Sequence, residues 1–524
     1  MSGSDQFQLY DTTLRDGAQR EGISYSVSDK LAVASLLDEF GVDFIEGGWP
    51  GALPKDTEFF EAARSITFNH ARLVAFGSTR KAGISVSEDP QVQALLDSGA
   101  PAVTVVAKSD IRHVEQALKT TPAENLSMVY DTVAYLVNNN RQVFVDLEHF
   151  FDGYTFDPDY AISVLEQAVQ AGAEVAVLCD TNGGMLPGGI TRIVKEVSEK
   201  TGARLGIHCQ DDTGCAVANS IAAVEAGAIH VQCTANGYGE RTGNADLFSV
   251  VANLQLKLGI ECVPPASLLE MSRISHAIAE IANIAPNTHQ PYVGVSSFAH
   301  KAGLHASALR INESLYNHIN PAEVGNTQRV LVTEMAGRAS VELKGKELGL
   351  DLTGNSEALA GVVERVKELE AQGWSFESAD ASFELLVREE TGENRRFEVE
   401  SWRTIVEQRE DGLVVSEATV KVHARGERIV ATGEGNGPVN ALDNALRSAV
   451  SQIFPDLAHL HLTDYKVRIL DGVKGTGAVT RVLVETSNGK KHWTTIGVHE
   501  NVIAASWQAL DDAVHFGMIH GSSQ

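Results

Sequence analysis

The sequence has few cysteines, and they form no pattern typical of disulfides or metal sites. Only five occur among 524 residues: Cys179, Cys209, Cys215, Cys233 and Cys262. None belongs to a CxxC pair, and an odd number does not suit a disulfide framework. We therefore expect free thiols in a reducing compartment.

Long apolar runs and an excess of positive charge are also missing. No uncharged apolar run approaches the roughly 18 residues that span a bilayer, and the N-terminus, MSGSDQFQLY, lacks the regions of a signal peptide. The 42 basic and 69 acidic residues give a net charge of -27, which disfavours nucleic acid and anionic membranes as partners. The expectation is a cytoplasmic protein without a nucleic-acid or membrane partner.

The length exceeds what one hydrophobic core usually holds, so two or three domains are expected. Eight short runs rich in Val, Ile, Leu and Phe begin near residues 8, 43, 72, 102, 143, 174, 204 and 230. Helix-like stretches such as SDKLAVASLLDEFG lie between them. This alternation predicts an α/β fold, a (β/α)8 TIM barrel over residues 1–275, with functional residues at the carboxyl ends of the strands.

The remaining chain changes character twice. SLLEMSRISHAIAEIANI predicts a helix that leaves the barrel, and residues 276–372 are expected to form helical linker subdomains. Residues 373–524 predict an α+β domain in which the strands FELLVREE, EATVKVHARG and ERIVATGEG precede a helix, VNALDNALRSAVSQI. A similar ββα unit follows, aligning Gly426 with Gly489 and Thr432 with Thr495. A duplicated unit of this kind is a plausible small-molecule sensor.

The segment DTTLRDGAQ, from Asp11 to Gln19, lies where the first barrel strand should end. One carboxylate there can bind a divalent cation, while Arg15 stabilises negative charge on a substrate oxygen. A surface turn with a salt bridge is the alternative.

Two further segments offer ligands for the same cation. His208 and Gln210 are two residues apart at the end of the seventh run, so a strand points both side chains the same way. The glycine-rich NGYGERTGN ends in Asn244, whose amide oxygen suits a hard cation. A structural histidine and a tight loop that needs glycine are the alternatives. Glu148 and Asp146 share one face of the fifth run, where a functional role is favoured because acidic residues are seldom buried without one.

Outside the barrel, FAHKAGLH places two histidines and a lysine in an apolar segment. They suit a proton donor near an anionic ligand, although a helix surface would explain them nearly as well.

Together, LRDG at 14–17, NGYGERTGNA from Asn236, FAHKAGLH from Phe298 and the duplicated C-terminal unit resemble a known family over essentially the whole chain. This family comprises the 2-isopropylmalate, homocitrate and citramalate synthases, which are metal-dependent TIM-barrel enzymes that condense acyl-CoA with keto acids. The resemblance implies a homodimer and the following roles. The implied metal ligands are Asp16, His208, Gln210 and Asn244. The implied catalytic residues are Arg15, Glu148, His300 and Tyr316. Substrate contacts fall to Arg15, Gln19, Asp146 and Thr181, while His300 and Tyr316 are delivered to the barrel of the partner subunit.

Gln210 departs from the family pattern, which has a second histidine at this position. Its amide oxygen can still coordinate, but the loss of a nitrogen ligand favours Mn²⁺ or Mg²⁺ over Zn²⁺, which stays possible.

Within the family, EHFFDGY, DYKVRILD and WTTIGV are most similar to the citramalate synthases. The similarity implies condensation of pyruvate with acetyl-CoA, hydrolysis to (R)-citramalate and CoA, and isoleucine as effector. A 2-isopropylmalate synthase regulated by leucine is the alternative. A less favoured alternative is a metal-poor sensor that lost catalytic activity because Gln210 replaces the histidine.

Overall fold

The computed structural model describes residues 7–333, 337–350, 352, 355–457, 459–470 and 472–520. The chain forms two compact units, Met1–Phe298 with Ile319–Thr327, and Ala299–His318 with Gln328–Gln524. Each unit has its own hydrophobic core. Among the described helices, none is long and apolar enough to cross a membrane.

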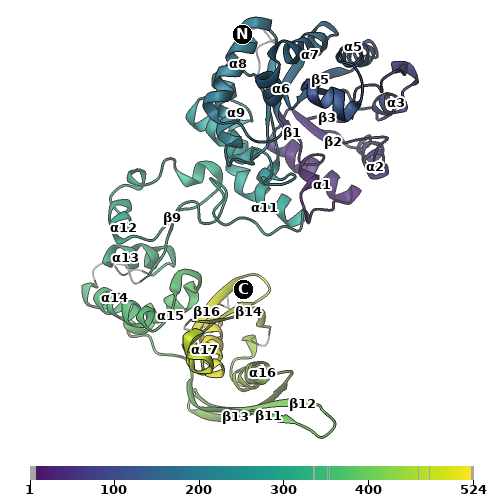
Figure 1. The fold of residues 1–524 in the computed structure, drawn as a ribbon. Coiled ribbons are helices and arrows are strands. Elements are labelled where there is room, and N and C mark those ends of the chain that lie inside the picture. The colour runs from purple at the N-terminus through teal and green to yellow at the C-terminus, as the bar shows by residue number, and fades with distance from the viewer. Residues whose placement is uncertain are drawn as a thin grey trace. The chain divides into compact units, whose positions relative to one another are not determined.

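The first unit is built on a closed barrel of eight parallel strands, which confirms the predicted TIM barrel (Figure 1). Each strand pairs with the next in sequence, and β8 closes the barrel onto β1. The strands are β1 (Gln8–Asp11), β2 (Phe44–Gly48), β3 (Arg72–Ser78), β4 (Ala102–Lys108), β5 (Gln142–Glu148), β6 (Val175–Asp180), β7 (Leu205–Cys209) and β8 (His230–Cys233).

Helices surround the barrel, and the first begins and ends with recognised signals. In α1 (Val27–Phe40), Ser26 and Asp29 form a capping box, and Gly41 ends the helix at φ 94°. The apolar faces of these helices join one core with the outward side chains of the strands. The others are α2 (Pro54–Ala63), α3 (Pro90–Asp97), α4 (Ile111–His113), α5 (Pro122–Asn138), α6 (Phe150–Phe156), α7 (Pro158–Gln170), α8 (Pro187–Thr201), α9 (Ala216–Glu225) and α10 (Leu247–Ala252).

The barrel interior is apolar at its amino end and polar at its carboxyl end. Tyr10, Phe44 and Phe144 belong to a buried cluster inside the barrel, and the ring of His230 lies within 5.2 Å of those of Tyr10 and Phe144. Burial lowers the pKa of His230 to about 3, so this end of the barrel holds a neutral imidazole.

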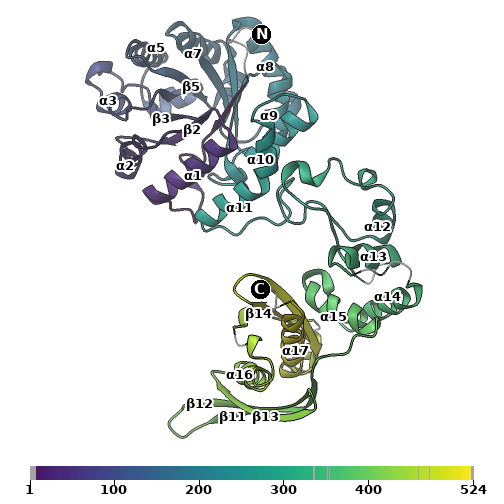
Figure 2. The ribbon, with the colours of Figure 1, turned by 180° about the vertical axis from the view of Figure 1, so that it is seen from behind.

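The helix predicted to leave the barrel instead packs against it. The segment forms a 3₁₀ helix (Pro265–Glu270) followed by α11 (Met271–Ile281), and α11 lies beside α1 in both views (Figures 1 and 2). Ile274 and Ile278, four residues apart, contribute to the barrel core because they share one helix face. The barrel unit consequently continues beyond residue 275.

The second unit begins with helices and a short parallel pair, β9 (Ala299–His300) with β10 (Arg329–Val330). The helices are α12 (Gly303–Leu309), α13 (Arg338–Glu347), α14 (Ser356–Ala371) and α15 (Asp380–Glu390). The strand predicted for FELLVREE was wrong, because these residues form part of α15. Phe383, Leu386 and Val387 are buried in one hydrophobic core. Their spacing of three and four residues places them on one face of a helix, whereas the side chains of a strand alternate between two faces.

The predicted duplication is present, with one more strand in each copy. The first sheet holds β11 (Glu398–Gln408), β12 (Val414–Ala424) and β13 (Glu427–Gly435), followed by α16 (Pro438–Ser451). The second holds β14 (His461–Ile469), β15 (Thr480–Ser487) and β16 (His492–His499), followed by α17 (Val502–His520). Each helix packs against the last two strands of its own copy.

The two copies differ in one hairpin. Two residues, 425–426, join β12 to β13, whereas four, 488–491, join β15 to β16. Gly433 pairs with Ala418 and approaches Ala441 O, and Gly497 pairs with Val482 and approaches Ala505 O, so both strands and the helix of the second copy lie 64 positions after those of the first. The predicted pairing of Thr432 with Thr495 uses an offset of 63 and is therefore one residue out of register.

Candidate active site

The carboxyl ends of β1 and β7 and the loop after β8 bring together the four residues predicted to bind metal. His208 Nε2 lies 3.3 Å from Asp16 Oδ2. Gln210 Nε2 lies 3.3 Å from the same oxygen and 3.4 Å from His208 Nε2. Asn244 pairs with Gln210 through an isolated β-bridge. All four residues are buried.

Two oxygen atoms of this group have no hydrogen-bond partner. They are Gln210 Oε1 and Asn244 Oδ1, and both are buried. Asn244 Nδ2 donates to Tyr238 O at 2.9 Å, which fixes the orientation of its amide. Buried carbonyl oxygens without partners are costly unless a ligand meets them. With a carboxylate and an imidazole beside them, they fit a hard divalent cation.

The charge of Asp16 is held by its neighbours. Burial raises the pKa of this carboxyl, but the positive charge of Arg15 and the hydrogen bond with His208 lower it to about 2. Burial lowers the pKa of His208, and the hydrogen bond and charge of Asp16 raise it above its usual value. Asp16 therefore stays negatively charged, and a proton on His208 competes with a metal cation for the imidazole nitrogen.

Arg15 is held in one orientation by Glu46, a residue for which no role was predicted from the sequence. Its Nε donates to Glu46 Oε2 at 2.6 Å, and its guanidinium carbon lies 3.9 Å from the centre of the Phe76 ring. Glu46 is fully buried and also accepts from Tyr10 at 2.6 Å and from Thr12 at 2.5 Å. Its position at the end of an apolar run was the only signal in the sequence.

Asp146 lies at the end of a hydrogen-bond chain that begins at His208. Gln232, on β8, connects the two residues. Its Oε1 lies 3.0 Å from His208 Nδ1, and its Nε2 donates to Asp146 Oδ1 at 2.7 Å. Burial and the nearby charge of Glu46 raise the pKa of Asp146 to about 7. Gln232 was not predicted as a site residue, although its spacing from His230 places it on the inner face of the barrel.

Glu148, Thr181 and Gln19 lie at the same end of the barrel. Glu148 forms an ion pair with Lys108, and the Thr181 hydroxyl accepts from His149 N at 2.8 Å. Gln19 ends the 3₁₀ turn Gly17–Gln19 that follows Asp16, and it is exposed.

His300 and Tyr316 belong to the second unit, where they form a ring cluster with His305. The His305 and Tyr316 rings stack with centres 4.0 Å apart, and the His300 ring lies 6.4 Å from Tyr316. His300 Nε2 lies 2.9 Å from Asn317 Oδ1. The two predicted residues are therefore neighbours within this unit.

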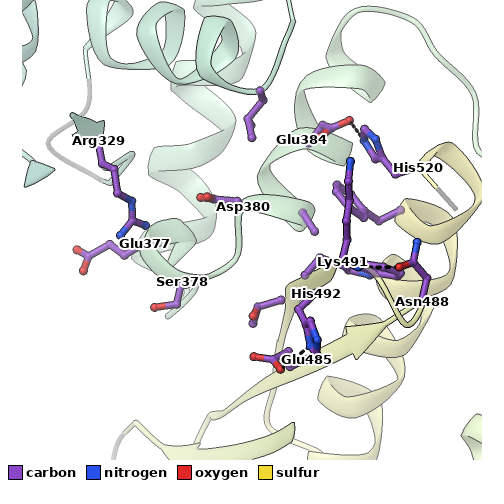
Figure 3. Close-up of a pocket in the computed structure, with 15 residues that line it drawn as sticks. Arg329, Glu377, Ser378, Asp380, Glu384, Glu485, Asn488, Lys491, His492 and His520 are labelled. Carbon is purple, nitrogen blue, oxygen red and sulfur yellow. Dashed lines mark hydrogen bonds and ion pairs between the residues drawn. The ribbon is translucent and has the colours of Figure 1, made fainter. Parts of the chain in front are cut away.

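The second unit also holds a cleft of about 430 Å³ between α15, the β15–β16 hairpin and α17 (Figure 3). Two of its acidic residues pair with histidines that also line the cleft. Glu384 lies 2.7 Å from His520 Nε2, and Glu485 lies 3.3 Å from His492 Nδ1. Lys491 extends into the cleft from the hairpin.

Comparison with known protein families assigns each part of the chain. The HMGL-like family matches residues 6–281, the homocitrate synthase post-HMGL domain-like family matches 292–373, and the LeuA allosteric (dimerisation) domain matches 377–518. The (R)-citramalate synthase of Streptomyces coelicolor is 65% identical over 518 residues, 98% of this chain and 97% of the relative. The chain belongs to the 2-isopropylmalate, homocitrate and citramalate synthase family.

Other members of the family are similar over the same length. The (R)-citramalate synthase of Aquifex aeolicus is 48% identical and covers 98% of both chains. A probable 2-isopropylmalate synthase of Methanopyrus kandleri is 34% identical and covers 97% of both. Within the family, identity is thus higher to these two citramalate synthases than to the isopropylmalate synthase.

Proposed function

We propose that this protein is a cytoplasmic acyltransferase that condenses pyruvate with acetyl-CoA and hydrolyses the thioester, releasing (R)-citramalate and CoA for isoleucine biosynthesis. The observation that carries the proposal is the group formed by Asp16, His208, Gln210 and Asn244 beside Arg15. Full-length similarity to (R)-citramalate synthases favours pyruvate as the keto acid.

The metal site rests on the two buried amide oxygens and their neighbours. Asp16, His208, Gln210 and Asn244 would hold the divalent cation, with Mn²⁺ or Mg²⁺ favoured because oxygen donors outnumber nitrogen donors. A bound cation supplies Lewis acidity toward the keto oxygen of pyruvate. The other steps fall to side chains of the protein.

Arg15 meets the negative charge that develops on the keto oxygen as the new carbon–carbon bond forms. Its hydrogen bond to Glu46 holds the guanidinium in place before substrate arrives, so no reorganisation is needed during the reaction. Thr181, Gln19 and Asp146 are the proposed substrate contacts, and Glu148, held by Lys108, organises the site.

The acetyl methyl group must lose a proton to attack the keto carbon. We assign this step to His300 with Tyr316, acting from the partner subunit of a homodimer. The contact between His300 and Asn317 leaves one ring nitrogen available to take the proton. Water then hydrolyses the thioester, which frees CoA.

The C-terminal unit is the proposed binding region for isoleucine as effector. Its cleft offers carboxylates and Lys491, groups that suit the ammonium and carboxylate of an amino acid. Inhibition by isoleucine that disappears in the Lys491→Met variant would support this location, and unchanged inhibition would exclude it.

The proposed reaction is tested by following thiol release from acetyl-CoA with pyruvate. Activity that is lost with a chelator and restored by Mn²⁺ or Mg²⁺ is the expected result. A protein that is purified without chelator, holds little metal and releases no CoA with any keto acid would be the metal-poor sensor instead.

A further inference from the structure

We infer that Gln232, held by the carboxylate of Asp146, sets the tautomer of His208 and keeps its Nε2 lone pair free for a cation. Gln232 would thus be a positioning residue for the reaction. The inference rests on the proposed role of His208 as a metal ligand.

The hydrogen-bond chain has only one consistent arrangement when Asp146 is a carboxylate. A carboxylate can only accept, so the Gln232 amide group must turn its NH₂ toward Asp146 Oδ1, 2.7 Å away. The Gln232 oxygen then faces His208 Nδ1 at 3.0 Å. An amide oxygen also only accepts, so Nδ1 carries a proton, and in the neutral imidazole Nε2 then carries none.

The neighbours of Nε2 act in opposite directions: the Gln210 amide nitrogen, 3.4 Å away, can donate to an unprotonated Nε2, whereas Asp16 favours the opposite tautomer. Asp16 Oδ2 lies 3.3 Å from Nε2 and would attract a proton to it. Such a proton would occupy the lone pair that a metal ligand needs. Gln232 is 1% exposed, so no bulk water can replace it as the partner of Nδ1. Its amide therefore opposes the pull of Asp16.

The barrel contains a matched chain that serves as a control. At its amino end, His230 Nδ1 lies 3.1 Å from Gln8 Oε1, and Gln8 Nε2 donates to Glu174 at 2.8 Å. This chain also runs from a histidine through a glutamine to a carboxylate, which is a glutamate here instead of an aspartate, but it touches none of the four proposed ligands. Gln8→Met removes a histidine–glutamine bond without altering the site.

The test is ¹⁵N NMR of histidine-labelled, chelator-treated protein at pH 9, with the His208 signals assigned from a His208→Gln variant. The wild-type protein and Gln8→Met are expected to show the proton on Nδ1 of His208. Gln232→Met is expected to move it to Nε2. Gln232→Glu, which keeps an acceptor beside Nδ1, should restore the wild-type form.

Affinity for Mn²⁺ gives a second readout. Gln232→Met should bind Mn²⁺ at least about tenfold more weakly, while Gln8→Met binds as the wild type does.

If Gln232→Met does not fold, Asp146→Asn decides, because it keeps the hydrogen-bond partners of His208 and should yield both tautomers. A proton that stays on Nδ1 in these variants would overturn the inference. Wild-type protein that binds no Mn²⁺ would instead refute the proposed metal site, and the tautomer would still be measured.

Discussion

Single residues at the carboxyl end of the barrel divide the proposed chemistry among them. Asp16 supplies a fixed negative charge, His208 a nitrogen donor, and Gln210 and Asn244 supply oxygens that have no other partner. Arg15 is the cation beside them, and its bond to buried Glu46 determines where it points. Because the donors come from three different chain segments, the loss of one should weaken the site without unfolding the barrel.

Gln210 should set the metal preference. Gln210→His adds an imidazole and should raise the affinity for Zn²⁺ relative to Mn²⁺ by about tenfold or more, because nitrogen ligands suit zinc better. Competition with a chromophoric chelator measures both affinities. Gln290→His, a change of the same type outside the four-residue group, is the control. An unaltered ratio in Gln210→His would show that residue 210 does not contact the metal.

Metal binding should weaken as the pH falls. The pKa of His208 is raised, chiefly by Asp16 against the effect of burial, so the imidazole keeps its proton to a higher pH than an ordinary histidine. Below that pKa, affinity for Mn²⁺ should fall about tenfold per pH unit, with the fall beginning above pH ~6.5. Titrations between pH 5.5 and 8.5 measure this. A constant affinity over that range would contradict the placement of His208 in the site.

The sequence was informative about site residues that follow recognisable strands. Asp16, His208, Gln210 and Asn244 lie in segments that follow apolar runs, the family resemblance implied their metal-binding roles, and the structure brings them together. Gln232 contacts His208 and Glu46 contacts Arg15, each from another strand. Their contacts depend on how the barrel closes, so no local pattern could assign them.

At the scale of elements, strand prediction succeeded where strands were buried on both faces. The eight barrel strands form continuous apolar runs typical of parallel sheets. In the C-terminal unit, α15 was predicted as a strand because its short apolar run fits either structure. The neighbouring β11 was missed because its side chains are mostly exposed and polar.

Each C-terminal helix approaches its sheet at a glycine. A Cβ atom on Gly497 would lie 1.9 Å from the carbonyl oxygen of Ala505 in α17. Gly497→Ala should therefore lower the free energy of unfolding of this unit by about 1–3 kcal/mol, since the helix must move away from β16. Denaturant unfolding measures the change. Gly477→Ala, where a Cβ would meet nothing within 4 Å, should have little effect. Equal stability of both variants would contradict the close packing.

At the scale of the whole molecule, the proposed active site combines two subunits. Arg15→Met removes a residue of the barrel unit, and His300→Ala removes one of the second unit, so each variant alone should be inactive. Mixed dimers contain one complete site if His300 serves the partner's barrel. Random pairing should then recover about a quarter of the wild-type rate. Recovery is measured by thiol release after co-expression, and none is expected if both residues act within one chain.

The net charge of -27 adds a constraint on the same scale, because pyruvate and acetyl-CoA are both anions. Arg15 and a bound cation would provide the positive charge that the rest of the protein lacks. Local charge at the carboxyl end of the barrel, rather than net charge, then governs substrate binding.

The most direct measurement compares CoA release from acetyl-CoA with pyruvate and with 2-oxoisovalerate, using the same metal-loaded protein. A kcat/KM that is at least about tenfold higher for pyruvate is the predicted result, corresponding to about 1.4 kcal/mol of discrimination. A clear preference for 2-oxoisovalerate would contradict the proposed function and identify a 2-isopropylmalate synthase.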